Sequence, residues 1–171
     1  SMSFAVWLTG LSGAGKSAVA KALLEELRAR GVAAAVLESD VMRTQLTPFA
    51  TYDEAERDFF YRVLADFAAR LTEDIPVVID ATANRRVYRD RAREAIPRFA
   101  EIHVSTPLEV CAARDTKGFY KSKNVKTLPG AQVPYEPPLA PELVLAGDRG
   151  TPREGAQAIV ELLSRRGWIG A

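Results

Sequence analysis

The chain has 171 residues, 47% of them hydrophobic and 26% charged, which is typical of one globular domain with a buried core. Its 23 Lys and Arg nearly balance its 22 Asp and Glu, and the net charge of +1 excludes an overall field that attracts nucleic acid or an anionic membrane. The single Cys111 excludes an intrachain disulfide, and no signal peptide or long apolar run is visible. We therefore expect residues 3–171 to form one cytoplasmic domain that binds neither membrane nor nucleic acid, and any anion binding must be local.

A phosphate loop near the start of the chain is the most specific pattern. The apolar residues 4–8 predict a buried strand, and GLSGAGKS at residues 10–17 then matches G-x-x-x-x-G-K-[ST] in full. Its glycines let backbone N–H groups point inward, and the N-terminus of the next helix adds a positive field for phosphate oxygens. Lys16 would reach the β- and γ-phosphates, and Ser17 would offer its hydroxyl to Mg²⁺. The predicted ATP-binding residues of this loop are Gly10, Leu11, Ser12, Gly13, Ala14, Gly15, Lys16 and Ser17.

A helix and a second strand are expected after the loop. Apolar residues recur at helical spacing over 19–27, and Gly31 predicts the end of that helix. The short apolar run 32–37 predicts a second buried parallel strand, which ends just before Asp40. Because open α/β sheets bind ligands at the carboxyl ends of their strands, Asp40 becomes a candidate catalytic residue.

Two helices are expected next. Residues 41–46 predict a short one, and Asp53 is expected to cap a longer one. In the longer helix Phe60, Phe67 and Leu71 recur at helical spacing, and we expect Phe67 and Leu71 to lie in the core.

The middle of the chain predicts two more strands. Residues 76–80 form an apolar run that ends in Asp80, which again places polar groups at the active edge of the sheet. The basic run 85–93 is typical of a solvated helix face, and the alternative is that one or two of its arginines contact an anion. A fourth strand is expected over 99–104, and its His103 is given no catalytic role, since a lone histidine in a strand is usually structural.

The last third alternates in the same way. Cys111 is expected to be a buried small residue on a helix, and the Lys- and Pro-rich segment 115–141 is expected to be a mobile lid that excludes water. A fifth strand at 143–145 and a closing helix at 152–166 follow. The alternation predicts an α/β fold, with a three-layer arrangement of a parallel β-sheet between helices.

The phosphate loop alone leaves hydrolysis and transfer of the phosphoryl group both open. The guanine signature of GTPases is absent and the chain is short, which favours a small-molecule kinase. Such an enzyme needs a carboxylate to orient the acceptor hydroxyl and cations over the transferred group. Asp40, Arg43 and Arg57 supply these residue types.

Three stretches resemble the adenylylsulfate (APS) kinase family: WLTGLSGAGKS at 7–17, TPLEVCAARDTKGFYK at 106–121 and PYEP at 134–137. The resemblance extends in register over nearly the whole chain. It implies a fold of the nucleoside-monophosphate-kinase type with a lid, and a homodimer. It also implies transfer of the γ-phosphate of ATP to the 3′-hydroxyl of APS to give PAPS, in sulfate assimilation.

The resemblance also assigns residues to roles. Asp40 and Lys16 would be catalytic, Ser17 and Asp40 would serve Mg²⁺, and Arg114 would join the ATP side. The residues aligned with the acceptor site are Arg43, Tyr52, Arg57, Phe60, Asn84, Lys117 and Leu128.

The acceptor half departs from the family pattern. Phe60 replaces an asparagine that would bind APS, Asn84 replaces an aromatic residue, and Leu128 replaces the phenylalanine that stacks on the APS adenine. Residues 80–82 also resemble small P-loop kinases related to polynucleotide kinase. An APS kinase with a rebuilt acceptor pocket, a relative that phosphorylates another hydroxyl compound, and a non-catalytic nucleotide-binding module are therefore the alternatives.

Overall fold

Parallel strands form the centre of the protein in the computed structural model, which describes residues 2–114 and 133–170. The sheet has five strands in the order β2-β3-β1-β4-β5, and every neighbouring pair is parallel. The strands are β1 (Ala5–Thr9), β2 (Ala35–Glu38), β3 (Val77–Asp80), β4 (Phe99–Ser105) and β5 (Leu143–Ala146). The helices are α1 (Lys16–Ala29), α2 (Ser39–Leu46), α3 (Glu54–Leu71), α4 (Arg86–Ala95), α5 (Leu108–Arg114) and α6 (Pro152–Arg165). The predicted parallel α/β fold is confirmed.

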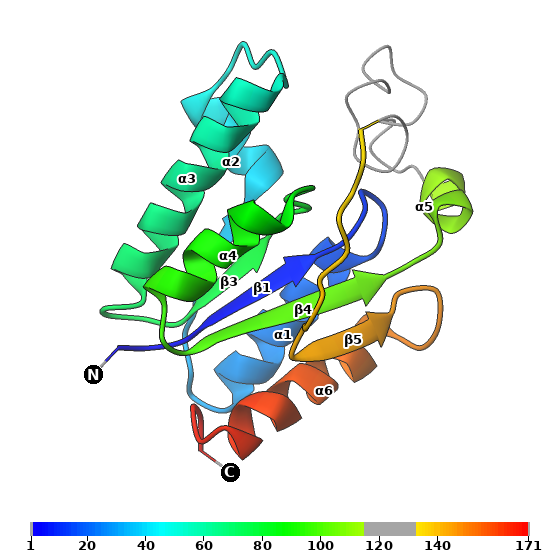
Figure 1. The fold of residues 1–171 in the computed structure, drawn as a ribbon. Coiled ribbons are helices and arrows are strands. Elements are labelled where there is room, and N and C mark those ends of the chain that lie inside the picture. Colours follow the sequence, from blue (N-terminus) through cyan, green and yellow to red (C-terminus); the bar gives the residue numbers. More distant parts are fainter. Residues whose placement is uncertain (1, 115–132, 171) are drawn as a thin grey trace.

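Helices cover both faces of the sheet, with α3 and α4 on one side and α1 and α6 on the other (Figure 1). Successive side chains of a strand point to opposite faces, so Trp7 packs in the cluster with α3 and α4, and Leu8 packs in the cluster with α1 and α6. Both residues are fully buried. The buried central strand therefore holds the phosphate loop, which follows it directly, on a rigid base.

The strand β2 differs from its prediction. It begins at Ala35 rather than at residue 32, and of its residues only Leu37 is buried. The reason is its place at the edge of the sheet, where it pairs only with β3. The run of alanine and valine residues therefore forms a strand, but the prediction that this strand is buried is wrong for all of its residues except Leu37.

The predicted core position of Phe67 is wrong, since this side chain is 45% exposed. The buried face of α3 runs through Tyr61, Ala65 and Ala68, and Phe67 lies at the margin of that face. Leu71 does pack against the core cluster of this side, as expected.

The basic run on α4 is also not wholly solvated. Arg89 is 1% exposed and pairs with Glu101 of β4 at 3.1 Å. Its guanidinium also donates to the carbonyl of Glu136. Arg89 therefore connects α4 to β4 of the sheet and to the segment around Glu136.

The end of the predicted lid is anchored rather than loose. Within the strap formed by residues 134–137, Glu136 N donates to Asn84 O at 2.8 Å and the Glu136 carboxylate accepts from Arg86 N at 2.8 Å. The Tyr135 hydroxyl lies 2.9 Å from Thr9 Oγ1, beside the phosphate loop. The predicted lid thus includes a hydrogen-bonded strap, and its mobility stays a prediction; residues 115–132 lie outside the described residues.

Helix α6 begins with a complete capping box, in which Thr151 Oγ1 accepts from Glu154 N at 3.1 Å and Glu154 Oε1 accepts from Thr151 N at 3.0 Å. Thr151→Ala is expected to lower the free energy of unfolding by about 1 kcal/mol, because the backbone N–H of Glu154 loses its side-chain acceptor. Denaturant unfolding measures this. Gln157→Ala, at an exposed site on the same helix, serves as the control and should shift stability by less than about 0.5 kcal/mol.

In the described part of the chain no helix is both long and apolar enough to span a membrane.

Candidate active site

The phosphate loop curls tightly between β1 and α1, at the carboxyl end of the sheet. Gly10 has φ 154°, and a Cβ there would lie 2.4 Å from Val104 O. Gly13 has φ 82°, and its Cβ would lie 2.9 Å from Cys111 O. Any side chain at these two positions would clash with backbone that cannot give way. The glycines thus allow the loop to pack closely on β4 and α5 in the tight curl that a phosphate-binding loop requires.

Lys16 turns back across the loop that precedes it. Its Nζ donates to Gly10 O at 2.9 Å and to Leu11 O at 2.8 Å, and the side chain is 8% exposed. The Lys16 side chain therefore reaches from the end of the loop back to the carbonyls at its start, where the ammonium group lies. Its charge lies where an incoming phosphate would approach.

Ser17 and Asp80 form a hydroxyl–carboxylate pair at the base of the site. Ser17 Oγ donates to Asp80 Oδ2 at 2.6 Å, and Asp80 is 7% exposed at the end of β3. Asp80 was expected at the active edge of the sheet but was given no role. That position was the available signal, because the phosphate loop lies at the same edge and its Ser17 needs an acidic neighbour for Mg²⁺.

The far side of the phosphate loop is held by Thr106 and Arg114. Thr106 Oγ1 donates to Ala14 O at 2.8 Å. Arg114 donates to the carbonyls of Gly13 and Ala14 at 3.3 Å and to Gly147 O at 2.7 Å. The predicted ATP-side arginine thus lies directly against the loop, and it joins the loop to the segment that leads into α6.

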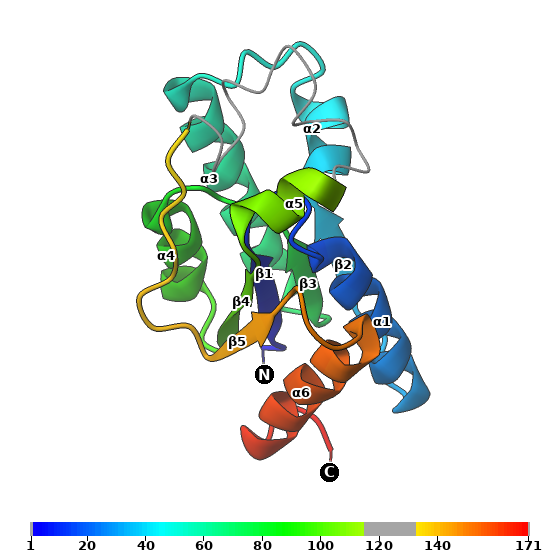
Figure 2. The same ribbon diagram turned by 90° about the vertical axis from the view of Figure 1, so that its right-hand side faces the viewer.

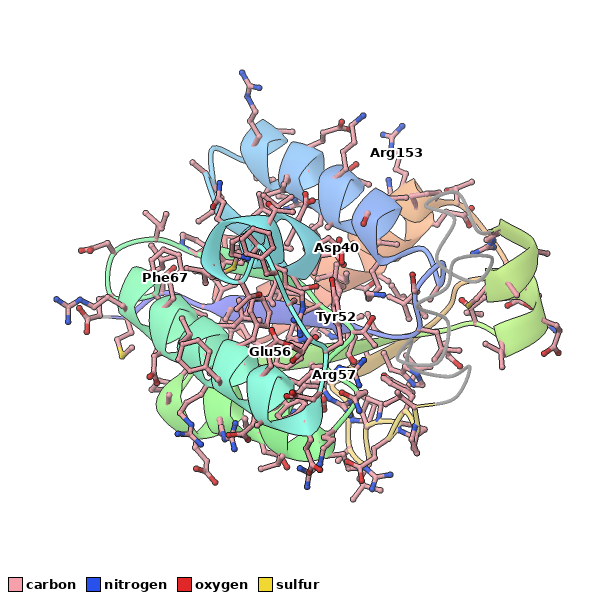
Figure 3. The ribbon with its side chains drawn as sticks, turned by 90° about the horizontal axis from the view of Figure 1, so that it is seen from above. Asp40, Tyr52, Glu56, Arg57, Phe67 and Arg153 are labelled. Atoms are coloured by element: carbon pink, nitrogen blue, oxygen red, sulfur yellow. The ribbon has the colours of Figure 1, made fainter. Side chains whose placement is uncertain are left out.

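A second group of side chains faces the loop from α2 and α3. Viewed from the carboxyl edge of the sheet, Asp40, Tyr52, Glu56 and Arg57 lie together over its centre, with Phe67 at the periphery (Figure 3). Asp40 is exposed in the first turn of α2. Figure 2 shows α2 and α5 at the same end of the sheet. A substrate bound there would lie between Asp40 and the phosphate loop.

Tyr52 adopts a strained backbone at the start of α3. Its φ of 58° lies in the left-handed region, which is rare for a residue with a large side chain. The ring centroid lies 4.9 Å from Arg43 Cζ, and the residue remains 36% exposed. The strain therefore coincides with an aromatic surface that a ligand can reach.

The two predicted acceptor arginines are both buried. Arg43 pairs with Glu56 at 2.6 Å, and its Cζ lies 4.3 Å from the centroid of the Phe60 ring. Burial is the main cause that lowers the pKa of Arg57, and the neighbouring Arg43 charge lowers it further. Phe60 itself has no exposed surface, so its predicted direct contact with the acceptor does not fit its position.

Asn84 contacts the strap through one side of its amide. Its Nδ2 donates to Pro134 O at 3.2 Å, and its backbone carbonyl accepts from Glu136 N, while its buried Oδ1 has no hydrogen-bond partner among the described residues. It therefore positions the strap, and its contact with the acceptor stays a prediction. The predicted contacts Lys117 and Leu128 lie outside the described residues.

His103 has no catalytic geometry. Burial and the nearby Arg89 charge lower its pKa, so the ring is neutral near pH 7. It lies beside Tyr135, with ring centroids 6.1 Å apart. This agrees with the structural role expected from the sequence.

A phosphate loop between the central strand of a parallel sheet and a helix defines a P-loop nucleotide-binding protein, the class that includes small-molecule kinases. The chain belongs to the adenylylsulphate kinase family, whose sequence model matches residues 2–146. The adenylyl-sulfate kinase of Rippkaea orientalis is 39% identical over 168 residues, which cover 96% of this chain and 93% of that protein. The corresponding enzyme of Halothermothrix orenii is 38% identical, with 96% and 91% covered.

Solved structures agree with this assignment. The Mycobacterium tuberculosis APS kinase CysC, in complex with AMPPNP and APS, has a TM-score of 0.86 and 33% identity, and the match covers 95% of this chain and 98% of that one. Shikimate kinase from Acinetobacter baumannii, at 18% identity and a TM-score of 0.67 with 96% and 94% covered, shares the fold alone. The predicted family and fold are therefore confirmed.

Proposed function

We propose that this chain phosphorylates the 3′-hydroxyl of APS with the γ-phosphate of ATP, to give PAPS and ADP. The observation that carries the proposal is a complete phosphate loop, with Lys16 folded over it, in a chain that matches adenylyl-sulfate kinases over 96% of its length. The backbone of residues 10–17 would bind the β- and γ-phosphates. Lys16 would stabilise the charge that develops on the transferred group.

We propose that Ser17 and Asp80 hold Mg²⁺. The pair supplies two adjacent oxygen atoms, which are the ligand type that Mg²⁺ prefers, and Mg²⁺ sites in kinases are completed by substrate phosphates and water. Bound Mg²⁺ would neutralise charge on the phosphate oxygens.

Asp40 is proposed to act on the acceptor. Its carboxylate would orient the 3′-hydroxyl in line with the γ-phosphate and accept its proton. The Asp40 carboxylate would also hold Mg²⁺ through a water molecule. The exposed Tyr52 ring would pack against the APS base, while Arg57 would add positive charge behind it.

An ADP-release assay with MgCl₂, ATP and a set of acceptors tests the function. The set contains APS, other nucleotides and simple hydroxyl compounds, and product analysis should show PAPS only with APS. Turnover of another acceptor without turnover of APS would favour a relative with a different substrate. ATP binding without turnover of any acceptor would favour a non-catalytic nucleotide-binding module.

Asp80→Asn should raise the Mg²⁺ concentration for half-maximal activity by roughly 10- to 100-fold, because Ser17 loses its anionic partner. A Mg²⁺ titration at saturating substrates measures this shift. Asp90→Asn, on the exposed face of α4, is the control and should leave the titration unchanged. An unchanged midpoint for Asp80→Asn would remove this residue from the metal site.

We also propose that residues 3–171 act as one domain, in the cytoplasm and as a homodimer. Two core clusters on opposite faces of one sheet support the single domain. The dimer is proposed from the family resemblance, and sedimentation velocity at micromolar concentration would test it.

A further inference from the structure

Helix α2 carries Asp40 but has little packing of its own. Of its residues only Arg43 is buried, while Val41 and Leu46 are 51% and 49% exposed. Met42 adds a partly buried contact to the cluster that contains α3. Asp40 precedes Arg43 by three residues, so both lie on one side of the helix. The position of Asp40 therefore depends strongly on what holds Arg43.

Helix α3 holds Arg43 by three of its side chains. Glu56 Oε1 lies 2.6 Å from Arg43 Nη1, and the exposed fractions of these side chains are 14% and 9%. The Phe60 ring, four residues further along the same face of α3, lies 4.3 Å from Arg43 Cζ. The Tyr61 ring lies 5.8 Å away. A carboxylate and two aromatic rings of α3 thus hold the Arg43 guanidinium of α2.

These contacts leave only 9% of the Arg43 side chain exposed. A planar guanidinium is recognised well by one carboxylate and one aromatic face, and here the protein supplies both. Such buried pairs add little net stability, but they select one geometry, because separating them leaves a charge without a partner. The contacts of Arg43 with Glu56 and Phe60 therefore mainly fix the orientation of α2 relative to α3.

We propose that Arg43 is a positioning residue that anchors α2 and so places Asp40, and that Phe60 contributes to the reaction by holding Arg43. The inference rests on the proposed function. It gives a role to Phe60, which stands where the family has an asparagine that would bind APS. The anchor predicts an effect on kcat, whereas an acceptor-binding Arg43 would predict an effect on the acceptor KM.

The first test is Phe60→Leu, which keeps an apolar side chain and removes the ring. We expect kcat to fall by roughly three- to thirty-fold, the range expected for a lost cation–π contact, while the KM for APS changes less than about twofold. In an Asp40→Asn background Phe60→Leu should cause no further loss, because the two residues act as one unit. Phe67→Leu, on the same helix and exposed, is the control.

The second test does not depend on activity. Hydrogen exchange of the amides of residues 39–46 should be faster in Phe60→Leu than in the unmodified chain, and unchanged in Phe67→Leu. If Phe60→Leu folds poorly, Glu56→Gln replaces it, because glutamine has nearly the same shape as glutamate. Exchange of the amides of residues 39–46 should again be faster than in the unmodified chain.

Two results would overturn the anchor: unchanged exchange in α2, or a raised KM for APS at normal kcat. If the unmodified chain does not phosphorylate APS, the proposed function is wrong but the anchor is not. The exchange measurement still decides whether Arg43 and Phe60 hold α2.

Discussion

Lys16→Ala is expected to lower kcat by at least about a hundredfold, the scale seen when one preorganised charge-stabilising donor is removed. Its ammonium lies across the phosphate loop, bonded to the carbonyls of Gly10 and Leu11, so it is in place before the nucleotide binds. No other described lysine lies in this loop. Steady-state kinetics with saturating ATP, Mg²⁺ and APS measures the loss.

Lys21→Ala is the matched control for this prediction. Lys21 is exposed on α1, the same helix, so its loss should leave kcat unchanged. Far-UV circular dichroism should show that both variants keep the fold, because the buried residues of α1 remain. Normal turnover by Lys16→Ala would remove the phosphate loop from the mechanism.

Asp40→Asn is expected to lower kcat by about a hundredfold or more, since a positioned acid–base group typically contributes this amount. An amide keeps the shape of the carboxylate but cannot accept the proton of the acceptor hydroxyl. The affinity for ATP should stay within a few-fold, because the phosphate loop is intact. Single-turnover kinetics, with ATP binding measured separately, divides the two effects.

Glu38→Gln is the control for Asp40, because Glu38 is an exposed acid two residues earlier, at the end of β2. It should change kcat less than twofold. A large rise in the KM for ATP at normal kcat in Asp40→Asn would contradict the proposed role and make Asp40 a nucleotide-binding residue.

Local sequence patterns predicted the fold correctly where each pattern is compatible with only one local structure. The phosphate loop, the Asp53 cap and the alternation of apolar runs with amphipathic helices each agree with the structure. The errors concern neighbours that are far apart in the chain. The edge position of β2 and the exposure of Phe67 depend on which element packs alongside, and spacing within one segment does not contain that information.

The same distinction explains the site. The ATP side was predictable because one continuous segment holds most of it. Asp80 was missed because its partner Ser17 is 63 residues away. Phe60 and Asn84 were placed at the acceptor by alignment, but the Phe60 ring packs against Arg43 and Asn84 Nδ2 bonds to Pro134 O. Which residues reach a ligand was decided by packing between α2, α3 and the strap.

The order of the strands also bears on how the chain folds. The central strand β1 is the first to be synthesised, yet both of its partners, β3 and β4, come much later, and the earlier of them begins at Val77. Until then the apolar β1 has no strand to pair with. Sheets closed by such distant contacts fold slowly and expose apolar segments on the way. The phosphate loop that β1 carries therefore gains its supporting carboxylate, Asp80, only after nearly half of the chain has emerged from the ribosome.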